Sequence, residues 1–307
     1  MRDQFIKRLA ELATQDKRIM LITGDLGFGV FIHFRETLPG QFINAGVAEQ
    51  NMTMLATGMA LEGHIVFTYS IGNFPTLRCL EMIRNDAAYH DANVKVVCIG
   101  GGFSYGALGI SHHATEDLAI MRSLPAVAVL SPCGLWEALE ATQAAVNTPG
   151  TCYLRLDKDH GEDSPRPGER FQLGQARVLR EGEDCAILVT GGILREVQKA
   201  ADDLAGQGIS VRIVSIHTLK PLDQVTVVRA ARETGGLITV EEHTLHGGLG
   251  GAVAELLMDS GVTPRRWLRI GLAAGFSSIV GSQEYLRRCY GLDAQSIARR
   301  VATLVRS

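Results

Sequence analysis

The sequence predicts an α/β protein of two doubly wound domains, each with a mostly parallel sheet covered by helices. Three observations support this prediction. Short apolar runs alternate with helix-like segments along the whole chain, as expected of βαβ units. The chain is 46% hydrophobic but only 6% aromatic, with 34 glycines, which suits sheets and helices packed through aliphatic side chains. A polar segment near residues 157–174 divides the alternation, and 307 residues are comfortable for two domains.

The first domain is predicted to span residues 1–160. It starts with the amphipathic helix pattern "MRDQFIKRLAELATQDKR". Short runs that are apolar on both faces are typical of buried parallel strands, and we assign five of them to residues 19–23, 64–69, 94–100, 126–132 and 151–156. Helix-like segments lie between them at residues 49–62, 74–90, 115–123 and 134–146.

A linker at residues 161–174 separates this domain from a second one at residues 175–307. The linker belongs to "DKDHGEDSPRPGERFQLG", which is polar and rich in proline and glycine. After it the alternation restarts, with expected strands at residues 185–190, 209–215, 236–243 and 267–272. Expected helices follow at residues 195–208, 224–235 and 248–261, with a final one near 283–306.

Charge and composition exclude several classes of protein. The net charge is −3 and the basic residues are scattered, so no nucleic-acid footprint is present. No apolar run reaches the roughly 20 residues of a membrane span, and the start of the chain lacks the apolar core of a signal peptide. The six cysteines lie far apart without a C-x-x-C pair, which favours reduced, mostly buried thiols. We therefore expect a cytoplasmic protein.

Several glycine clusters superficially resemble nucleotide-binding loops. "GDLGFGVF", "GGGFSYG" and "HGGLGG" lack both the G-x-G-x-x-G and the G-x-x-x-x-G-K-[ST] spacing, so ordinary turns are the better interpretation. The pairs His113/Glu116 and His243/His246 each offer two ligands, which do not close a tetrahedral site. We expect no metal ligands on this chain.

One carboxylate stands in an unusual setting. Glu49 lies in "QFINAGVAEQNMTMLATGMALEG", a run of mostly small, apolar or amide side chains. A helix over residues 49–62 would bury Met52, Leu55, Ala56 and Met59 on one face and place Glu49 in the first turn. Glu49 could simply cap that helix. A partly desolvated carboxylate is also a common state of a catalytic acid.

The motif "FINAGVAEQNM" resembles the pyrimidine-domain signature of the transketolase family of thiamine diphosphate enzymes. That family includes deoxyxylulose-phosphate synthase and the β subunits of 2-oxo-acid dehydrogenases. Six further blocks resemble the family in the same order: "TGDLG", "NFPTLRCLEMIRND", "GISHHATEDLAIMRSLP", "YLRL", "SIHTLKPLD" and "TVEEHTLHGGLGGAV". Together they cover nearly the whole chain, which makes the resemblance specific.

The resemblance implies a cofactor-binding set. Glu49 matches the glutamate that hydrogen-bonds N1′ of the thiamine diphosphate aminopyrimidine, and so relays a proton during catalysis. Phe74 matches the residue whose ring stacks on the aminopyrimidine. Asp25 resembles a residue near the cofactor, and Tyr69 is a lesser candidate. Gly27, Phe28 and Gly29 stand where full-length transketolases have polar groups.

The resemblance also implies a substrate-binding set. His112 matches a histidine that faces the substrate and can donate to a developing oxyanion or move a proton. The adjacent His113 is the alternative if the alignment is shifted by one residue. Arg155 and Arg2 match arginines that bind the sugar phosphate, because the guanidinium fork holds two oxygens at once.

The family's diphosphate-binding domain has no counterpart in this sequence. That domain carries a GDG motif followed by an asparagine, which hold Mg²⁺ and the diphosphate. The only similar segment is "GDL" at residues 24–26. The chain therefore resembles the C-terminal half of a transketolase, a pyrimidine-binding domain plus the transketolase C-terminal domain. We expect a partner subunit with the diphosphate domain, an α2β2 assembly, and "EEHTLHGGLGG" at a subunit contact.

The leading function is that of a subunit of a split transketolase, which moves a two-carbon ketol unit between phosphorylated sugars. A 2-oxo-acid dehydrogenase β subunit and a deoxyxylulose-phosphate-synthase-like half are the enzymatic alternatives. A non-catalytic subunit that only stabilises its partner is the non-enzyme alternative, and a plain nucleotide-binding module is the third.

Overall fold

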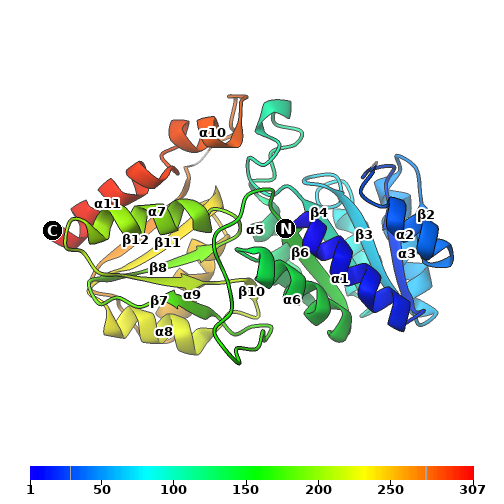
Figure 1. Cartoon of the computed structure of the whole chain (residues 1–307), viewed down its shortest axis with the longest axis horizontal. Coiled ribbons are helices and arrows are strands. Elements are labelled where there is room, and N and C mark those ends of the chain that lie inside the picture. Colours follow the sequence, from blue (N-terminus) through cyan, green and yellow to red (C-terminus); the bar gives the residue numbers. More distant parts are fainter. Residues whose placement is uncertain (28, 274) are drawn as a thin grey trace.

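The computed structural model describes residues 1–27, 29–273 and 275–307, which form two α/β units (Figure 1). Each unit has one mixed, mostly parallel sheet with helices on both faces, which confirms the predicted fold class. Within the described residues no helix is long and apolar enough to cross a membrane. All six cysteines are free, and only Cys289 is exposed.

The first sheet has seven strands in the order β10-β5-β6-β4-β3-β1-β2. Six come from the first unit and run parallel: β1 (Ile19–Thr23), β2 (Phe42–Asn44), β3 (Ile65–Ile71), β4 (Val94–Ile99), β5 (Val127–Leu130) and β6 (Thr151–Leu156). The side chains of a strand alternate between its two faces, so each strand serves two apolar clusters. One cluster packs under helices α1 (Arg2–Gln15) and α6 (Leu135–Asn147), the other under α3 (Glu49–Leu61) and α5 (Asp117–Ser123).

The second sheet has five strands in the order β12-β11-β8-β9-β7. They are β7 (Arg177–Arg180), β8 (Cys185–Thr190), β9 (Val211–Ser215), β11 (Leu237–Thr244) and β12 (Trp267–Leu272), and only β7 is antiparallel to its neighbour. Five helices flank this sheet: α7 (Leu194–Ala205), α8 (Gln224–Glu233), α9 (Leu249–Asp259), α10 (Gln283–Cys289) and α11 (Ala294–Arg306).

The two units are joined by more than the linker. Strand β10 (Thr218–Lys220) belongs to the second half of the sequence, yet it pairs antiparallel with β5 of the first sheet. Glu241, Glu242 and His243 are all buried within the chain, and the backbone N–H of Ala119 donates to His243 Nε2 across the unit boundary. These three side chains therefore serve an internal contact, and the expectation that they lie at a subunit contact is wrong for them.

Some elements differ from the prediction. The expected helix over 74–90 begins only at α4 (Leu80–Met82) and continues as a π-helix over Ile83–Ala88. The expected final helix is two helices, because Gly291 adopts a positive φ of 66° and Asp293 caps a new start through the Ser296 N–H.

The buried face of α3 is also rotated from the prediction. Met52 and Ala56 are buried as expected, but Leu55 is 37% exposed. Thr53 and Thr57 are buried instead, because each hydroxyl donates to the backbone carbonyl four residues earlier. This leaves Leu55 and Met54 on the outer surface of α3.

Candidate functional site

Glu49 is the first residue of α3, and its side chain is only 4% exposed. Ala48 occupies the N-cap position and no side chain caps the helix, so Glu49 is not a capping residue. Its Oε2 atom instead accepts a hydrogen bond of 2.9 Å from Arg78 Nη1. Gly24 lies beside it, because a Cβ built there would stand 3.5 Å from Glu49 Cγ. A buried carboxylate is thus held against a single cation at the carboxyl end of β1.

Arg78 connects Glu49 to two aromatic rings. The guanidinium carbon of Arg78 lies 5.3 Å from the ring centre of Phe74, within cation–π range. The Phe74 ring in turn meets the His112 ring edge-on, with centres 5.1 Å apart. We call Glu49, Arg78, Phe74 and His112 the Glu49 cluster. It joins residues from α3, the segment before α4 and the loop after β4.

The structure distinguishes the two adjacent histidines. His112 is partly exposed and faces Phe74, and its Nδ1 lies 2.9 Å from Ser111 Oγ. His113 points inward, with Nε2 3.0 Å from the carbonyl oxygen of Gly106. Burial, and secondarily the neighbouring His113, lower the pKa of His112 below its ordinary value. His112 therefore presents a neutral imidazole to the cluster at neutral pH.

Asp25 lies in the turn that follows β1, with a positive φ of 57°. Asn44 holds this conformation, because its Oδ1 accepts from the Asp25 backbone N–H at 3.0 Å and its Nδ2 donates to Asp25 Oδ1 at 2.9 Å. Asp25 is the direct neighbour of Gly24 and so lies close to Glu49. Phe28, named above for its departure from the family pattern, lies outside the described residues.

Tyr69 is not part of the Glu49 cluster. It packs with Phe5 and Phe31 in the apolar cluster under α1, whereas α3 covers the other face of the sheet. The side-chain alternation of β3 explains this, since Tyr69 and Phe67 point to one face and their neighbours to the other. The structure gives Tyr69 a place in the core, and the resemblance alone did not reveal which face it occupies.

Arg155 is fully buried rather than open to a substrate. Its Nε lies 3.3 Å from Asp157 Oδ1 and 3.7 Å from Asp117 Oδ2, and Nη2 donates to the Glu242 backbone carbonyl at 3.1 Å. Burial alone would lower the pKa of Arg155, but the Asp117 and Asp157 carboxylates outweigh it and raise the pKa. The charge is already balanced inside the chain. This setting corrects the expectation of an accessible phosphate-binding arginine and makes Arg155 a structural link between the units.

Arg2 lines a cavity of about 250 Å³. Lys158 and Tyr105 line the same cavity. The Lys158 ammonium lies 3.5 Å from the Tyr105 ring centre, and the Tyr105 and His112 rings are 6.2 Å apart. Lys158 thus reaches the His112 side through the Tyr105 ring. Arg2 lines the same cavity, together with Asp3 and Asp157, and pairs with the exposed Asp3 at 2.8 Å.

Sequence reasoning missed Arg78 and Lys158. Arg78 lies four residues after Phe74, inside one of the blocks that carry the resemblance, but an arginine in an exposed segment looks like any surface cation. Lys158 falls at the start of the polar segment 157–174 that divides the two predicted domains, three residues before the assigned linker. Only the fold brings each of them to a functional side chain.

The Glu49 cluster has the donor set that an aminopyrimidine requires. A buried carboxylate can accept from a ring N–H or share its proton, and an aromatic ring supplies a flat contact. The Arg78 guanidinium, a flat cation with N–H donors, contacts both the carboxylate and the Phe74 ring. Val47 and Leu77, close in sequence to Glu49 and Arg78, are exposed by 75% and 47%, and Met54 on α3 is exposed by 46%. Among the described residues, no three His, Cys, Asp or Glu side chains gather where they could hold a metal ion.

Comparisons with known proteins match both units. The transketolase pyrimidine binding domain matches residues 1–162, and the transketolase C-terminal domain matches residues 174–297. A putative transketolase C-terminal section of Methanocaldococcus jannaschii is 36% identical over 98% of this chain and 95% of its own length. A 6-deoxy-6-sulfo-D-fructose transketolase subunit of Clostridium sp. (strain MSTE9) is 36% identical over 97% and 92%. Among solved structures, a split gene transketolase described as an inactive beta4 tetramer superposes with a TM-score of 0.87, at 33% identity over 99% and 97% of the two chains.

Proposed function

The chain belongs to the transketolase family, and on that premise we propose that it is one subunit of a thiamine diphosphate-dependent split transketolase. In this proposal the enzyme transfers a two-carbon ketol unit between sugars. A partner subunit supplies the diphosphate-binding domain and the Mg²⁺ ligands, and two copies of each chain form the enzyme. The single observation that supports it best is the Glu49 cluster, a buried carboxylate and an aromatic ring separated by a flat cation.

The cofactor, when bound, supplies the electron sink that makes carbon–carbon bond cleavage in a sugar feasible. Glu49 holds or exchanges a proton at the ring nitrogen that it faces, and burial keeps water away from that hydrogen bond. Phe74 gives the ring an apolar contact and fixes its plane. Asp25 borders the same space through the Gly24 turn.

His112 acts on the substrate side of the cluster. Because burial lowers its pKa, the imidazole is neutral at neutral pH and can accept a proton from a sugar hydroxyl or donate a hydrogen bond from its N–H to a developing oxyanion. Arg2 and Lys158, at the cavity beside Tyr105, bind the anionic end of the substrate. His113 and Arg155 act indirectly, by holding the backbone around these groups.

The need for a partner is supported by the surface beside Glu49. Val47 and Leu77 are large apolar side chains that lie exposed next to a polar site, which is typical of a surface that another protein covers. The relatives named as a transketolase C-terminal section and as a transketolase subunit are matched over 95% and 92% of their length, so they too consist largely of these two domains. The substrate named for the Clostridium subunit is a sulfonated sugar, and a phosphate or sulfonate end is compatible with Arg2 and Lys158.

A calorimetric titration of thiamine diphosphate with Mg²⁺ tests the proposal. We expect binding to the complex with the co-purified partner and none to the isolated chain, because the diphosphate ligands lie on the partner. Tight binding to the isolated chain would place the diphosphate site here, and binding to neither would exclude the thiamine mechanism. Turnover of the complex with ketose donors and aldose acceptors then separates transketolase from a non-catalytic subunit.

A further inference from the structure

His112, the candidate substrate-facing histidine, lies on a long loop that has little regular secondary structure. We call residues 101–113 the His112 loop. It follows β4 and contains only one turn of 3₁₀-helix, Gly106–Leu108. Its two ends are closed by a pair of backbone hydrogen bonds between Gly102 and Ala114, of 2.7 and 3.0 Å. The loop between them needs other contacts to hold one conformation.

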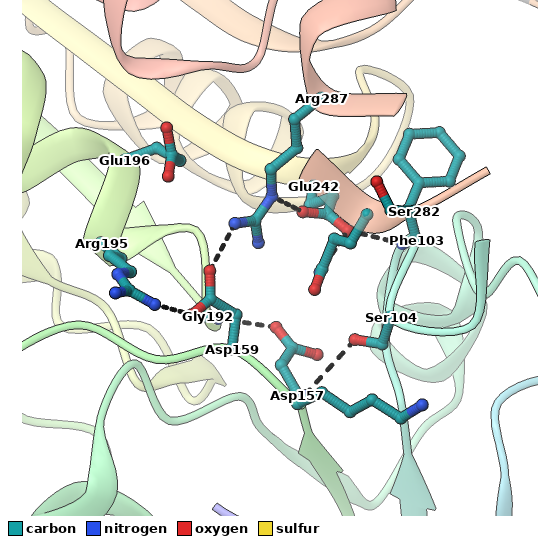
Figure 2. Close-up of polar contacts among 12 residues, drawn as sticks. Phe103, Ser104, Asp157, Asp159, Gly192, Arg195, Glu196, Glu242, Ser282 and Arg287 are labelled. Carbon is teal, nitrogen blue, oxygen red and sulfur yellow. Dashed lines mark hydrogen bonds and ion pairs between the residues drawn. The ribbon is translucent and has the colours of Figure 1, made fainter. Parts of the chain in front are cut away.

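Glu242, on strand β11 of the second unit, supplies such a contact (Figure 2). Its Oε1 atom accepts from the backbone N–H of Phe103 at 2.5 Å. The same atom accepts from Gln283 Nε2 at 2.9 Å. Its Oε2 atom accepts from Arg287 Nε. Glu242 also packs against the loop backbone, because a Cβ on Gly102 would stand only 2.4 Å from Oε1. A buried carboxylate of one unit is thus fixed to the loop of the other.

The partners of Glu242 are themselves held in place. Arg287 Nη1 donates to Asp159 Oδ2 at 2.6 Å, and Arg195 Nη1 donates to Asp159 Oδ1 at 3.2 Å (Figure 2). Burial alone would lower the pKa of Arg287, but Glu242 and Asp159 outweigh it and raise the pKa. Arg287 therefore stays charged, and the chain of ion pairs fixes the Glu242 carboxylate against the Phe103 N–H.

Helix α10 adds an apolar contact to the same loop. Gly106 lies close to α10, because a Cβ built on it would stand 2.5 Å from a methyl carbon of Leu286. The Gly281 backbone N–H, just before α10, donates to the Gly106 carbonyl at 3.3 Å. The rings of Phe103 and Tyr290 stack with centres 5.3 Å apart. In Figure 1 the segment around residue 105 and α10 rise side by side above the two sheets. The His112 loop is therefore held from the side of the second unit.

We propose that Glu242 is a positioning residue for His112, so that the second unit sets the geometry of the candidate site in the same chain. The hydrogen bond to the Phe103 N–H fixes one end of the loop, and the Gly106 contacts fix its middle. His112 then meets Phe74 in a defined orientation. This inference rests on the proposed function only for what His112 does, since the loop anchorage itself is independent of any reaction.

A different ion pair provides a matched control. Arg122 on α5 forms two hydrogen bonds with Glu255 on α9, at 2.7 and 2.8 Å, and these also join the two units. That pair makes no hydrogen bond to the His112 loop among those that the structure shows. Glu255→Ala therefore removes a contact between the units without touching the loop, whereas Glu242→Ala removes the loop contact itself.

Hydrogen–deuterium exchange of the full chain tests the anchorage without an activity assay. Peptides that cover residues 103–113 are compared in the wild type, Glu242→Ala, Glu242→Gln and Glu255→Ala. We expect exchange about tenfold faster in Glu242→Ala, the effect of losing a hydrogen bond to a charged group. Glu242→Gln keeps one acceptor oxygen and should fall in between, and Glu255→Ala should match the wild type. If Glu242→Ala does not fold, the test rests on Glu242→Gln, in which we expect the loop to exchange severalfold faster than in the wild type. Loop exchange within twofold of the wild type in every folded Glu242 variant would overturn the proposal.

The assembled complex supplies the second readout. With the loop loosened, kcat should fall about tenfold in Glu242→Ala, while the dissociation constant of thiamine diphosphate stays within twofold, because Glu49 and Phe74 are untouched. A general loss of stability would instead weaken both together. An unchanged kcat in an active complex would overturn the positioning role. If the wild-type complex has no transketolase activity but the exchange pattern is as expected, the proposed function fails and the loop anchorage remains.

Discussion

Arg78 Nη1 donates to Glu49 Oε2 at 2.9 Å, and the same guanidinium stands 5.3 Å from the Phe74 ring centre. The two partners are very unequally buried, since the Arg78 side chain is 51% exposed and that of Glu49 only 4%. Glu49 is fixed by its place in the first turn of α3, whereas the Arg78 guanidinium reaches it from the surface. The arginine thus neutralises a buried carboxylate and can withdraw when another donor takes its place.

Glu49→Gln should abolish turnover of the assembled complex without unfolding it. The amide has nearly the same shape, but it cannot share a proton with a ring nitrogen, so we expect kcat to fall by about 10²–10⁴. Steady-state kinetics measures this loss, and the thermal midpoint checks folding. Glu62→Gln, at the exposed C-cap of the same helix, is the control and should retain full activity. Retention of activity in Glu49→Gln would favour the non-catalytic alternative.

Arg78→Ala should tighten cofactor binding in the assembled complex. A half-exposed ion pair contributes about 0–1 kcal/mol, so removing it relieves at most about a fivefold competition for the Glu49 carboxylate. Calorimetry on the complex measures the dissociation constant of thiamine diphosphate. Arg84→Ala, on the neighbouring π-helix, should bind as the wild type does. Weaker binding by Arg78→Ala would mean that the guanidinium contacts the cofactor instead of competing with it.

Much of the fold was accessible from the sequence because its strands are continuous apolar runs. Strand β1 was predicted with the bounds that the structure shows, Ile19–Thr23, since five consecutive apolar or small residues between polar ends leave little choice. Strands β2 and β7 were missed, because three or four residues with partly exposed side chains produce no such run. Leu55 was wrongly predicted to be buried, because the helical periodicity was read from apolar side chains alone. Thr53 is buried instead, since its hydroxyl donates to the Glu49 backbone carbonyl within the helix.

The candidate site was predictable only where a residue is unusual in its local sequence. Glu49 stood out as a carboxylate among apolar neighbours, and Phe74 was identified through the motif around it. Glu242 could not be found in this way, since its partners Phe103 and Arg287 lie 139 and 45 residues away in the chain. Arg155 shows the opposite error. An arginine in a family motif can bind a ligand or form an internal ion pair, and only its burial in the structure shows that Arg155 does the second.

Arg155→Ala should destabilise the chain strongly. The substitution leaves the buried Asp117 and Asp157 carboxylates without their shared cation, and breaking a buried pair in this way costs about 3–5 kcal/mol. Chemical denaturation followed by circular dichroism measures the change. Arg180→Ala removes an ion pair with Asp202 between more exposed side chains and should cost less than about 1 kcal/mol. A similarly small cost for Arg155→Ala would indicate that the residue is free to serve a ligand.

The unfolding free energy of the chain should rise between pH 8 and pH 10.5 because of Lys95. Burial lowers the pKa of Lys95 from 10.5 to about 8, even though its ammonium donates to the carbonyl oxygens of Thr148 and Gly150 at 2.6 and 2.5 Å. Between these two values the unfolded chain binds more protons than the folded chain, so stability increases with pH by up to ~1.4 kcal/mol per unit, about 3 kcal/mol in all. Below pH 8 both states are protonated and this contribution is constant. The unfolding free energy of the wild type minus that of Lys95→Met is measured, because buried thiols that do not interact with Lys95, such as Cys185, titrate alike in both proteins and cancel. A difference that is flat or falls across this window would show that the carbonyl contacts, and not burial, govern the lysine.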